Sequence, residues 1–168
     1  MGHKMTDQKW MRKALELARK AGDKGEIPVG ALLVEEGEII GSGGNARGAQ
    51  RSPLEHAEVL ALKRAARRRG DWRFPRATMY VTLEPCSMCT GALLQARVSR
   101  LVFGAYNEET GCCVSLLNLA DVPGARSQLE VVGGVLESEC LEQLKSFFES
   151  RRGGRAWLNA LDSKSSRG

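Results

Sequence analysis

The sequence predicts an α/β domain in which helices cover a sheet. Stretches with apolar residues at helical spacing alternate along the chain with short β-rich runs. The 168 residues, of which 42% are hydrophobic, suit one domain with a single core. Only the stretch from Gly153 onward has a loosely ordered composition. We therefore expect a single domain over residues 1–152 and a flexible C-terminal tail over residues 153–168.

The first part of the chain predicts a helix, a hairpin and a loop. Thr6 is a candidate N-cap for the helix, and Gly22 is its candidate end. The runs IPVGALLV and EIIGSG predict two strands joined by a turn at Glu36 and Gly37. The stretch GSGGNARGAQRSP that follows is rich in glycine and predicts a loop.

The rest of the chain predicts three more strands and three helices. A helix is expected over residues 55–69, a strand over residues 77–83, and another helix directly after Pro85. The runs RLVFGA and LEVVGGV predict two further strands. The segment ESECLEQLKSFFESRR has the apolar spacing of a final amphipathic helix.

Composition argues against a membrane or secreted protein. The longest uncharged apolar runs are too short to cross a bilayer, and the opening MGHKMTDQKW lacks the apolar stretch of a signal peptide. Five cysteines, an odd number, fit metal ligation and buried thiols better than a disulfide framework. These features predict a cytoplasmic protein that does not bind membranes.

The net charge of +5 is unevenly distributed. Residues 101–148 carry two basic and seven acidic side chains, whereas arginines gather over residues 67–76 and 151–155. Such clusters suit the phosphates of a nucleic acid. Charge alone, however, favours solvated helix faces over a binding surface.

Two short motifs point to chemistry: HAE, which contains His56 and Glu58, and PCSMC, which contains Cys86 and Cys89. At a helix start the two thiols share one face near the positive end of the helix dipole, which favours thiolates. His56 would add a nitrogen ligand and leave a fourth position open for water. Mixed sulfur and nitrogen ligands favour zinc. Glu58, free beside the metal, would serve as general acid and base.

Other interpretations of the cysteine motif remain open at this point. A Cys-x-x-Cys pair alone also fits a redox pair or a structural zinc site. A structural site needs a fourth protein ligand, for which Cys112, Cys113 and Cys140 are the cysteine candidates. A non-catalytic RNA-binding partner subunit that keeps zinc for folding is a further alternative. That alternative gives no use for Glu58, and free cysteines are commonly buried small hydrophobes.

From about Thr6 to Arg152, the chain resembles the cytidine-deaminase-like superfamily and, within it, the bacterial tRNA-specific adenosine deaminase family. The resemblance is carried by IPVGALLV, the asparagine of GGNAR, HAE, YVTLEPCSMCTGAL, RLVFGA, the following TG and SLLNL, and FFESRR. It implies a three-layer α/β/α fold with a central five-stranded mixed sheet, assembled as a homodimer. It also implies one Zn²⁺ per subunit on His56, Cys86 and Cys89, with Glu58 moving protons and Asn45 contacting the target base.

The implied reaction is the hydrolytic deamination of adenosine to inosine at the wobble position of a tRNA anticodon. The target base would be splayed out of the anticodon stem-loop to reach the metal. The resemblance places Phe148 and Arg152 at the RNA. Without it, the pattern favours a core role for Phe147 and Phe148.

Two departures from the family pattern bear on the substrate. Asn107 stands where these enzymes often have an aspartate next to the anticodon loop, and an amide can still hydrogen-bond RNA. Arg126 and Ser127 stand where they commonly have Asn-His. These departures leave open a guanine, cytosine or nucleoside deaminase with the same zinc core, although the basic termini favour a polyanionic substrate.

Overall fold

The computed structural model describes residues 2–122 and 128–151, with side chains from Met5 onward. Residues 126 and 127, Arg152 and the expected flexible tail lie outside the described residues. In chain order the elements are α1 (Gly2–Asp23), β1 (Gly30–Glu35), β2 (Glu38–Gly44), α2 (Arg47–Gln50), α3 (Ala57–Arg69), β3 (Thr78–Leu83), α4 (Ser87–Gln95), β4 (Arg100–Ala105), β5 (Glu130–Val132) and α5 (Glu137–Glu149).

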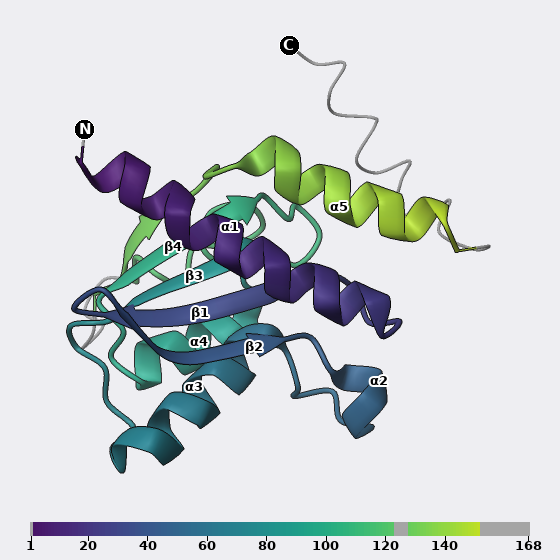
Figure 1. The fold of residues 1–168 in the computed structure, drawn as a ribbon. Coiled ribbons are helices and arrows are strands. Elements are labelled where there is room, and N and C mark those ends of the chain that lie inside the picture. Colours follow the sequence, from purple (N-terminus) through teal and green to yellow (C-terminus); the bar gives the residue numbers. More distant parts are fainter. Residues whose placement is uncertain (1, 123–127, 152–168) are drawn as a thin grey trace.

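The strands form one mixed sheet in the order β2-β1-β3-β4-β5. Strand β1 is antiparallel to both of its neighbours, whereas β3, β4 and β5 run parallel. Figure 1 shows α1 and α5 on one face of this sheet and α3 and α4 on the other. The described residues thus confirm the three-layer α/β/α arrangement around five strands.

The alternation of side chains along the strands creates one core on each face of the sheet. Leu33, Met79 and Phe103 belong to the cluster that packs against α3 and α4. Leu32 and Val102 belong to the cluster on the opposite face, together with residues of α1 and α5. Each central strand is therefore buried on both faces, as expected for a strand covered by helices.

The glycine-rich stretch predicted as a loop overlaps the predicted strand EIIGSG: its first four residues belong to strand β2, and residues 47–50 form the short helix α2. A Cβ atom on Gly41 would lie 2.2 Å from the carbonyl oxygen of Ala61, and one on Gly43 would lie 2.6 Å from that of Ala57. The predicted strand EIIGSG is confirmed, whereas the loop prediction was wrong for residues 41–44, because these glycines do not serve a flexible loop. They let α3 lie directly on the edge strand.

The predicted hairpin is confirmed, whereas the limits of the first helix were wrong. Glu36 and Gly37 both have positive φ, as a two-residue hairpin turn requires. Helix α1 already begins at Gly2, since no proline interrupts the residues before Thr6. It ends at Asp23, and the residue with positive φ beyond it is Gly25, not Gly22.

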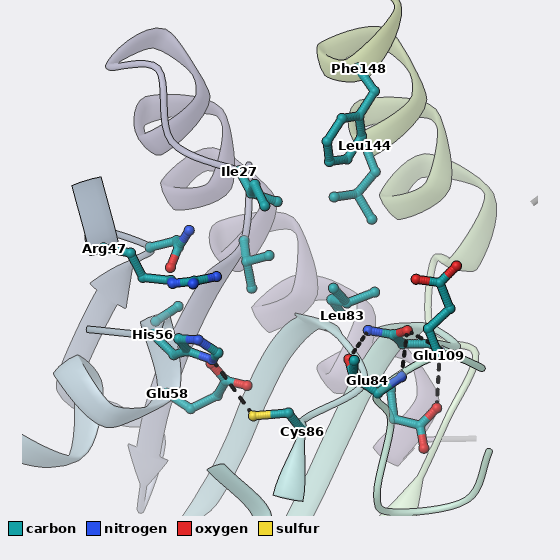
Figure 2. A pocket seen from close by; sticks show the side chains of 15 residues that line it. Ile27, Arg47, His56, Glu58, Leu83, Glu84, Cys86, Glu109, Leu144 and Phe148 are labelled. Carbon is teal, nitrogen blue, oxygen red and sulfur yellow. Dashed lines mark hydrogen bonds between the residues drawn. The ribbon is translucent and has the colours of Figure 1, made fainter. Parts of the chain in front are cut away.

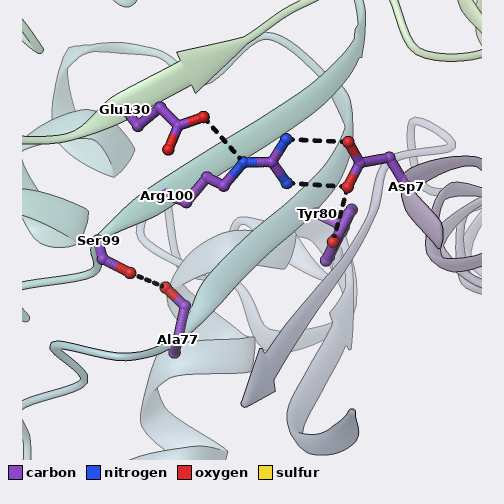
Figure 3. A network of polar contacts seen from close by, with 6 residues as sticks. All are labelled: Asp7, Ala77, Tyr80, Ser99, Arg100 and Glu130. Atoms are coloured by element: carbon purple, nitrogen blue, oxygen red, sulfur yellow. Dashed lines mark hydrogen bonds and ion pairs between the residues drawn. The ribbon is translucent and has the colours of Figure 1, made fainter. Parts of the chain in front are cut away.

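A buried ion pair fixes α1 to the sheet (Figure 3). The Arg100 guanidinium donates to both carboxylate oxygens of Asp7 at 2.8 and 2.9 Å, and the Tyr80 hydroxyl donates to the same carboxylate at 2.9 Å. The Nε of Arg100 also donates to Glu130 at 3.2 Å, which links β4 to β5. We call Asp7, Tyr80, Arg100 and Glu130 the clamp.

Within the described residues, no helix combines the length and the apolar character needed to cross a membrane.

Candidate active site

Two helix N-termini meet where the parallel strand β3 ends. His56 is the N-cap of α3, and Cys86 is the N-cap of α4. Both residues have extended backbone, with φ of −73° and ψ of 154° and 175°. Their side chains can therefore leave the helix axis and approach each other. Cys89 follows one turn into α4 and is buried.

The three expected ligands form one compact group. The Nδ1 atom of His56 lies 3.7 Å from the Sγ of Cys86 and 3.5 Å from the Sγ of Cys89. Zinc bonds of about 2.3 Å to sulfur and about 2.05 Å to nitrogen place such atoms about 3.5 Å apart around a tetrahedral ion. All three donor atoms lie within 4.8 Å of one another. Their types and spacing therefore fit tetrahedral zinc.

The other cysteines do not supply a fourth ligand. In the described part of the chain, the group of possible metal ligands contains His56, Cys86 and Cys89 alone. Cys112 donates to the carbonyl oxygen of Thr110, and Cys113 lies 3.2 Å from the Thr90 hydroxyl. Burial raises the pKa of both Cys113 and Cys140 to about 12, which is typical of inert core thiols.

Hydrogen bonding and charge separate the two thiols of the group. Cys86 accepts a hydrogen bond from Cys89 and interacts with His56, which lowers the pKa of Cys86 to about 4. The same hydrogen bond, together with burial, raises the pKa of Cys89. In the absence of a metal, Cys86 is therefore the thiol of this group that ionises more easily.

Glu58 lies in the first turn of α3 and is only 4% exposed. Burial raises its pKa above the ordinary value of 4.5, while its own backbone and His56 act in the opposite direction. A carboxyl group whose pKa is raised by burial holds a proton more readily than an exposed one, which suits a general acid and base. Figure 2 shows its side chain beside His56 and Cys86, at the inner end of the pocket.

A pocket of about 200 Å³ opens over this group. The pocket is smaller than the roughly 300–1,000 Å³ of sites that enclose a drug-sized ligand. It therefore suits a single planar base, and the rest of a larger substrate must lie outside. In Figure 2 the side chains of α5 face those of α2 and α3 across it. The residues that line the pocket include Asn45, Arg47, His56, Glu58, Glu84, Cys86, Asn107, Glu109, Thr110 and Phe148.

The expected substrate residues are placed unequally. Asn45 is buried in the pocket wall, on the segment that follows β2. Phe148 is half-buried, because it lines the pocket and also packs against the α1/α5 core. The core contact of this phenylalanine is confirmed, whereas its contact with the substrate stays a prediction. Arg152 lies outside the described residues.

Asn107 lies in the pocket wall, but its amide is used inside the chain. Its Nδ2 donates to the Thr110 hydroxyl at 2.7 Å, and its Oδ1 accepts from the backbone N–H groups of Glu109 and Thr110 at 3.2 Å. The amide therefore shapes the turn over residues 107–110. An RNA contact by this side chain would compete with these hydrogen bonds.

Two pocket residues escaped the sequence reasoning. Arg47, in the stretch taken for a loop, lines the pocket from α2. A hydrogen bond with Cys86 raises the pKa of His56, and the charge of Arg47 acts in the opposite direction. Glu84 directly precedes Pro85 and is 2% exposed. Its position directly before the PCSMC motif was the one sequence feature that could have indicated a role. Its hydrogen-bond partners, however, lie more than twenty residues further along the chain.

A second, more open groove continues from the pocket. The two share Ile27, Asn45, Arg47 and Phe148. Three arginines line the groove, namely Arg47, Arg51 and Arg151. The Arg151 guanidinium lies 4.4 Å from the centre of the Phe147 ring. The described lining thus contains cations and the aromatic rings of Phe147 and Phe148, beside one acidic residue, Glu26. Cations and aromatic rings are also found together in surfaces that bind single-stranded nucleic acid.

Comparisons with known proteins identify the family of the chain. The family model for MafB19-like deaminases matches residues 5–152. The tRNA-specific adenosine deaminase of Bacillus subtilis (strain 168) is 45% identical over 146 residues, which cover 87% of this chain and 91% of the relative. That of Haemophilus influenzae (strain ATCC 51907 / DSM 11121 / KW20 / Rd) is 48% identical over 147 residues, covering 87% and 85%.

A solved structure from studies of A-to-I editing by tRNA:A34 deaminases at the wobble position of transfer RNA has a TM-score of 0.76 and 38% identity to this chain. The match covers 79% of this chain and 96% of that chain. It confirms the cytidine-deaminase-like fold class expected from the sequence. This chain, a MafB19-like deaminase, belongs to the family of tRNA-specific adenosine deaminases, which are hydrolytic enzymes.

Proposed function

We propose that the protein hydrolyses adenosine to inosine at the wobble position of a tRNA anticodon, using one zinc ion per subunit. The observation that carries this proposal is the His56, Cys86 and Cys89 group with the buried carboxyl of Glu58 beside it, in a pocket the size of one base. The membership of the chain in the deaminase family supports the same reaction. A purely structural zinc site would have no use for Glu58.

His56, Cys86 and Cys89 would hold the metal, and their mixed nitrogen and sulfur donors suit zinc. When bound, zinc would supply a nucleophile at neutral pH by acidifying water. Because two thiolates offset the charge of Zn²⁺, a carboxylate that takes up the proton is useful.

Glu58 would carry the protons of the reaction. It would accept a proton from the attacking water and deliver it to ring nitrogen N1, and would then accept the proton of the hydroxyl group formed on C6 and deliver it to the departing amino nitrogen. The water oxygen would end on C6 as the inosine carbonyl, and the amino group would leave as ammonia. The raised pKa of Glu58 supports this role, because the same group must accept and then release a proton.

The remaining pocket residues would hold the base. Asn45 offers a buried amide that can both donate and accept hydrogen bonds at the rim of the base. Phe148 offers an aromatic ring at the pocket mouth. Because the pocket accepts about one base, the adenosine must be splayed out of its loop.

The flanking nucleotides would lie in the arginine-lined groove. Arg47, Arg51 and Arg151 could neutralise phosphates there, and Phe147 and Phe148 could stack on bases. Arg152, outside the described residues, is proposed as a further phosphate contact. A polyanionic substrate explains this groove better than a free guanine or cytosine does.

We also propose a homodimer that acts in the cytoplasm, where its tRNA substrate would be found. Val114, Leu116 and Leu117 are exposed apolar side chains on one short segment, which is typical of a protein interface. Sedimentation equilibrium would test this assembly, with a mass near 37 kDa, twice the 18.3 kDa chain, expected for the dimer.

The substrate proposal is tested by product analysis. The purified, zinc-loaded protein is incubated with an anticodon stem-loop that carries adenosine at the wobble position, and separately with adenosine, guanine and cytosine. Inosine in the RNA and no ammonia from the free compounds is the expected result. Ammonia from guanine or cytosine without inosine in RNA would instead assign a free-base deaminase.

The groove is tested by replacing Arg151 and Arg152 together with alanine. RNA binding should weaken, and the slope of log affinity against log salt should flatten by about 0.7 for each lost phosphate contact to a single strand. Replacing Arg67, in the last turn of α3, and Arg76, in the segment before β3, with alanine gives the charge-matched control. Equal slopes for parent and groove variant would make Arg151 and Arg152 ordinary surface charge.

A further inference from the structure

The buried carboxylate of Glu84 is the centre of an unusually dense set of hydrogen bonds. Its Oε1 accepts from the backbone N–H groups of Cys113, Val114 and Ser115, at 3.2, 2.8 and 2.9 Å. Its Oε2 accepts from the backbone N–H of Asn107 at 3.0 Å and from the Ser115 hydroxyl at 2.5 Å. All five donors come from residues 107–115, which we call the wall segment.

The wall segment forms one side of the pocket. Asn107, Glu109 and Thr110 all line it. The side-chain amide of Asn107 closes the turn over residues 107–110, so the turn and the Glu84 carboxylate are joined through this one residue. Figure 2 shows Glu84 and Glu109 on the side of the pocket opposite Arg47.

The same segment is joined to the turn that carries Cys86. The backbone N–H of Cys112 donates to the carbonyl oxygen of Pro85 at 2.9 Å, and Gly111 forms an isolated antiparallel bridge with Cys86. Glu84 is two residues before Cys86 and faces the wall segment from this turn. Its carboxylate therefore stands between one of the metal-ligating residues and the wall of the pocket.

The space around the carboxylate is filled. A Cβ atom on Gly111 would lie 2.4 Å from the carboxyl carbon of Glu84 and 2.4 Å from the carbonyl oxygen of Asn107. Both distances are far below a normal contact, so any side chain at this position must displace the wall segment or Glu84.

We propose that Glu84 is a positioning residue for the deamination, which sets the distance between the wall segment and the metal ligands. This inference rests on the function proposed above. A carboxylate can accept all five hydrogen bonds because it presents only acceptors. The amide of a glutamine keeps one acceptor oxygen and turns an N–H₂ donor toward N–H donors, so the wall segment must move away.

The experiment measures steady-state kinetics on the stem-loop RNA for Glu84→Gln, per zinc-loaded chain and at a temperature where every variant is folded. Glu84→Gln should keep its zinc but lose about 10²-fold in kcat/KM, since misplacement of about 1 Å has that effect. Glu84→Asp, which keeps the acceptors, should recover part of the loss. Gly111→Ala, which presses on the same carboxylate, should reproduce it.

Glu16→Gln, an exposed carboxylate on α1, makes the same change in net charge and should behave as the parent. Amide hydrogen exchange gives a readout that needs no activity: residues 106–116 should exchange faster in Glu84→Gln, and residues 57–69 should be unchanged. If the parent fails to deaminate RNA, the proposed function fails, and the exchange pattern alone then decides the role of Glu84.

A folded, zinc-loaded Glu84→Gln with a kcat/KM within threefold of the parent would overturn the inference. So would a loss of activity that added zinc fully restores, because Glu84 would then serve metal retention. If Glu84→Gln does not fold, Glu84→Asp and Gly111→Ala are judged by the same two criteria.

Discussion

Two of the buried acidic centres in the described residues, one at Asp7 and one at Glu58, are built in opposite ways. Asp7 and Glu58 are each 4% exposed. Asp7 belongs to the clamp, near the start of the parallel strand β4, and receives two hydrogen bonds from Arg100 and one from Tyr80. Glu58 lies near the other end of the sheet, in the pocket beside the metal-ligand group, where burial raises its pKa.

This difference shows how one fold divides stability from chemistry. A buried carboxylate that is held by a guanidinium and a phenol is fixed in place by charge-assisted hydrogen bonds. A buried carboxyl group without such a partner can change its protonation state, as a general acid and base must. We therefore expect changes at Glu58 to alter turnover and changes in the clamp to alter stability.

The largest effect is expected for Glu58→Gln. The variant cannot move a proton, so inosine formation under single-turnover conditions should fall by about 10²- to 10⁴-fold. Its zinc content should match that of the parent, and its free energy of unfolding should be equal or higher, because a neutral amide replaces a carboxyl group in a buried site. A rate within tenfold of the parent would remove Glu58 from the reaction.

The next effect is expected for Asp7→Ala, which leaves Arg100 without its main partner. Loss of one member of a buried ion pair should lower the free energy of unfolding by about 3–5 kcal/mol. Urea unfolding followed by circular dichroism would measure this change. The kcat/KM on RNA, taken well below the melting temperature, should stay at the parent value. A clear loss of turnover in the folded variant would contradict the division between the two centres.

The smallest effect is expected for Tyr80→Phe, which removes a single hydrogen bond from the clamp. Stability near neutral pH should fall by about 0.5–1.5 kcal/mol. Burial and the hydrogen bond to Asp7 raise the pKa of Tyr80 above its ordinary value of 10.0. The unfolded chain therefore loses its tyrosine proton first, and the contribution of Tyr80 is present below about pH 10 and lost as the pH rises further.

This prediction is checked by melting both proteins between about pH 9 and pH 11. The parent should lose melting temperature more steeply than Tyr80→Phe, so that the gap between them narrows. Parallel curves would show that the clamp does not hold Tyr80 in its neutral form.

Much of the fold could be predicted from local sequence patterns. The strands in IPVGALLV and RLVFGA were recognisable as continuous apolar runs. Helices cover both faces of the sheet, so successive side chains on these strands are buried on one face or the other. The hairpin turn needed only Glu36 and Gly37. The glycines from Gly41 to Gly44 were assigned partly to the strand EIIGSG and also to a glycine-rich loop. The loop assignment was wrong because Gly41 and Gly43 lie directly against helix α3, which comes later in the chain.

The residues of the candidate site were likewise predictable only where they lie in short local motifs. His56, Glu58, Cys86 and Cys89 sit in two short motifs, so their chemistry was visible in sequence. Glu84 was not, because its five donors lie in a segment that begins at residue 107. The hydrogen bond from the Asn107 amide to Thr110 could not be predicted either, because it depends on the geometry of the turn over residues 107–110.

The central claim is that one imidazole and two thiolates hold a zinc ion with a position left open next to Glu58. X-ray absorption at the zinc edge of the purified protein tests it most directly. From the usual zinc bond lengths, we predict two sulfur atoms at about 2.3 Å from the zinc and two lighter atoms, nitrogen or oxygen, at about 2.0–2.1 Å. A third sulfur, or a shell of oxygen atoms alone, would contradict the account.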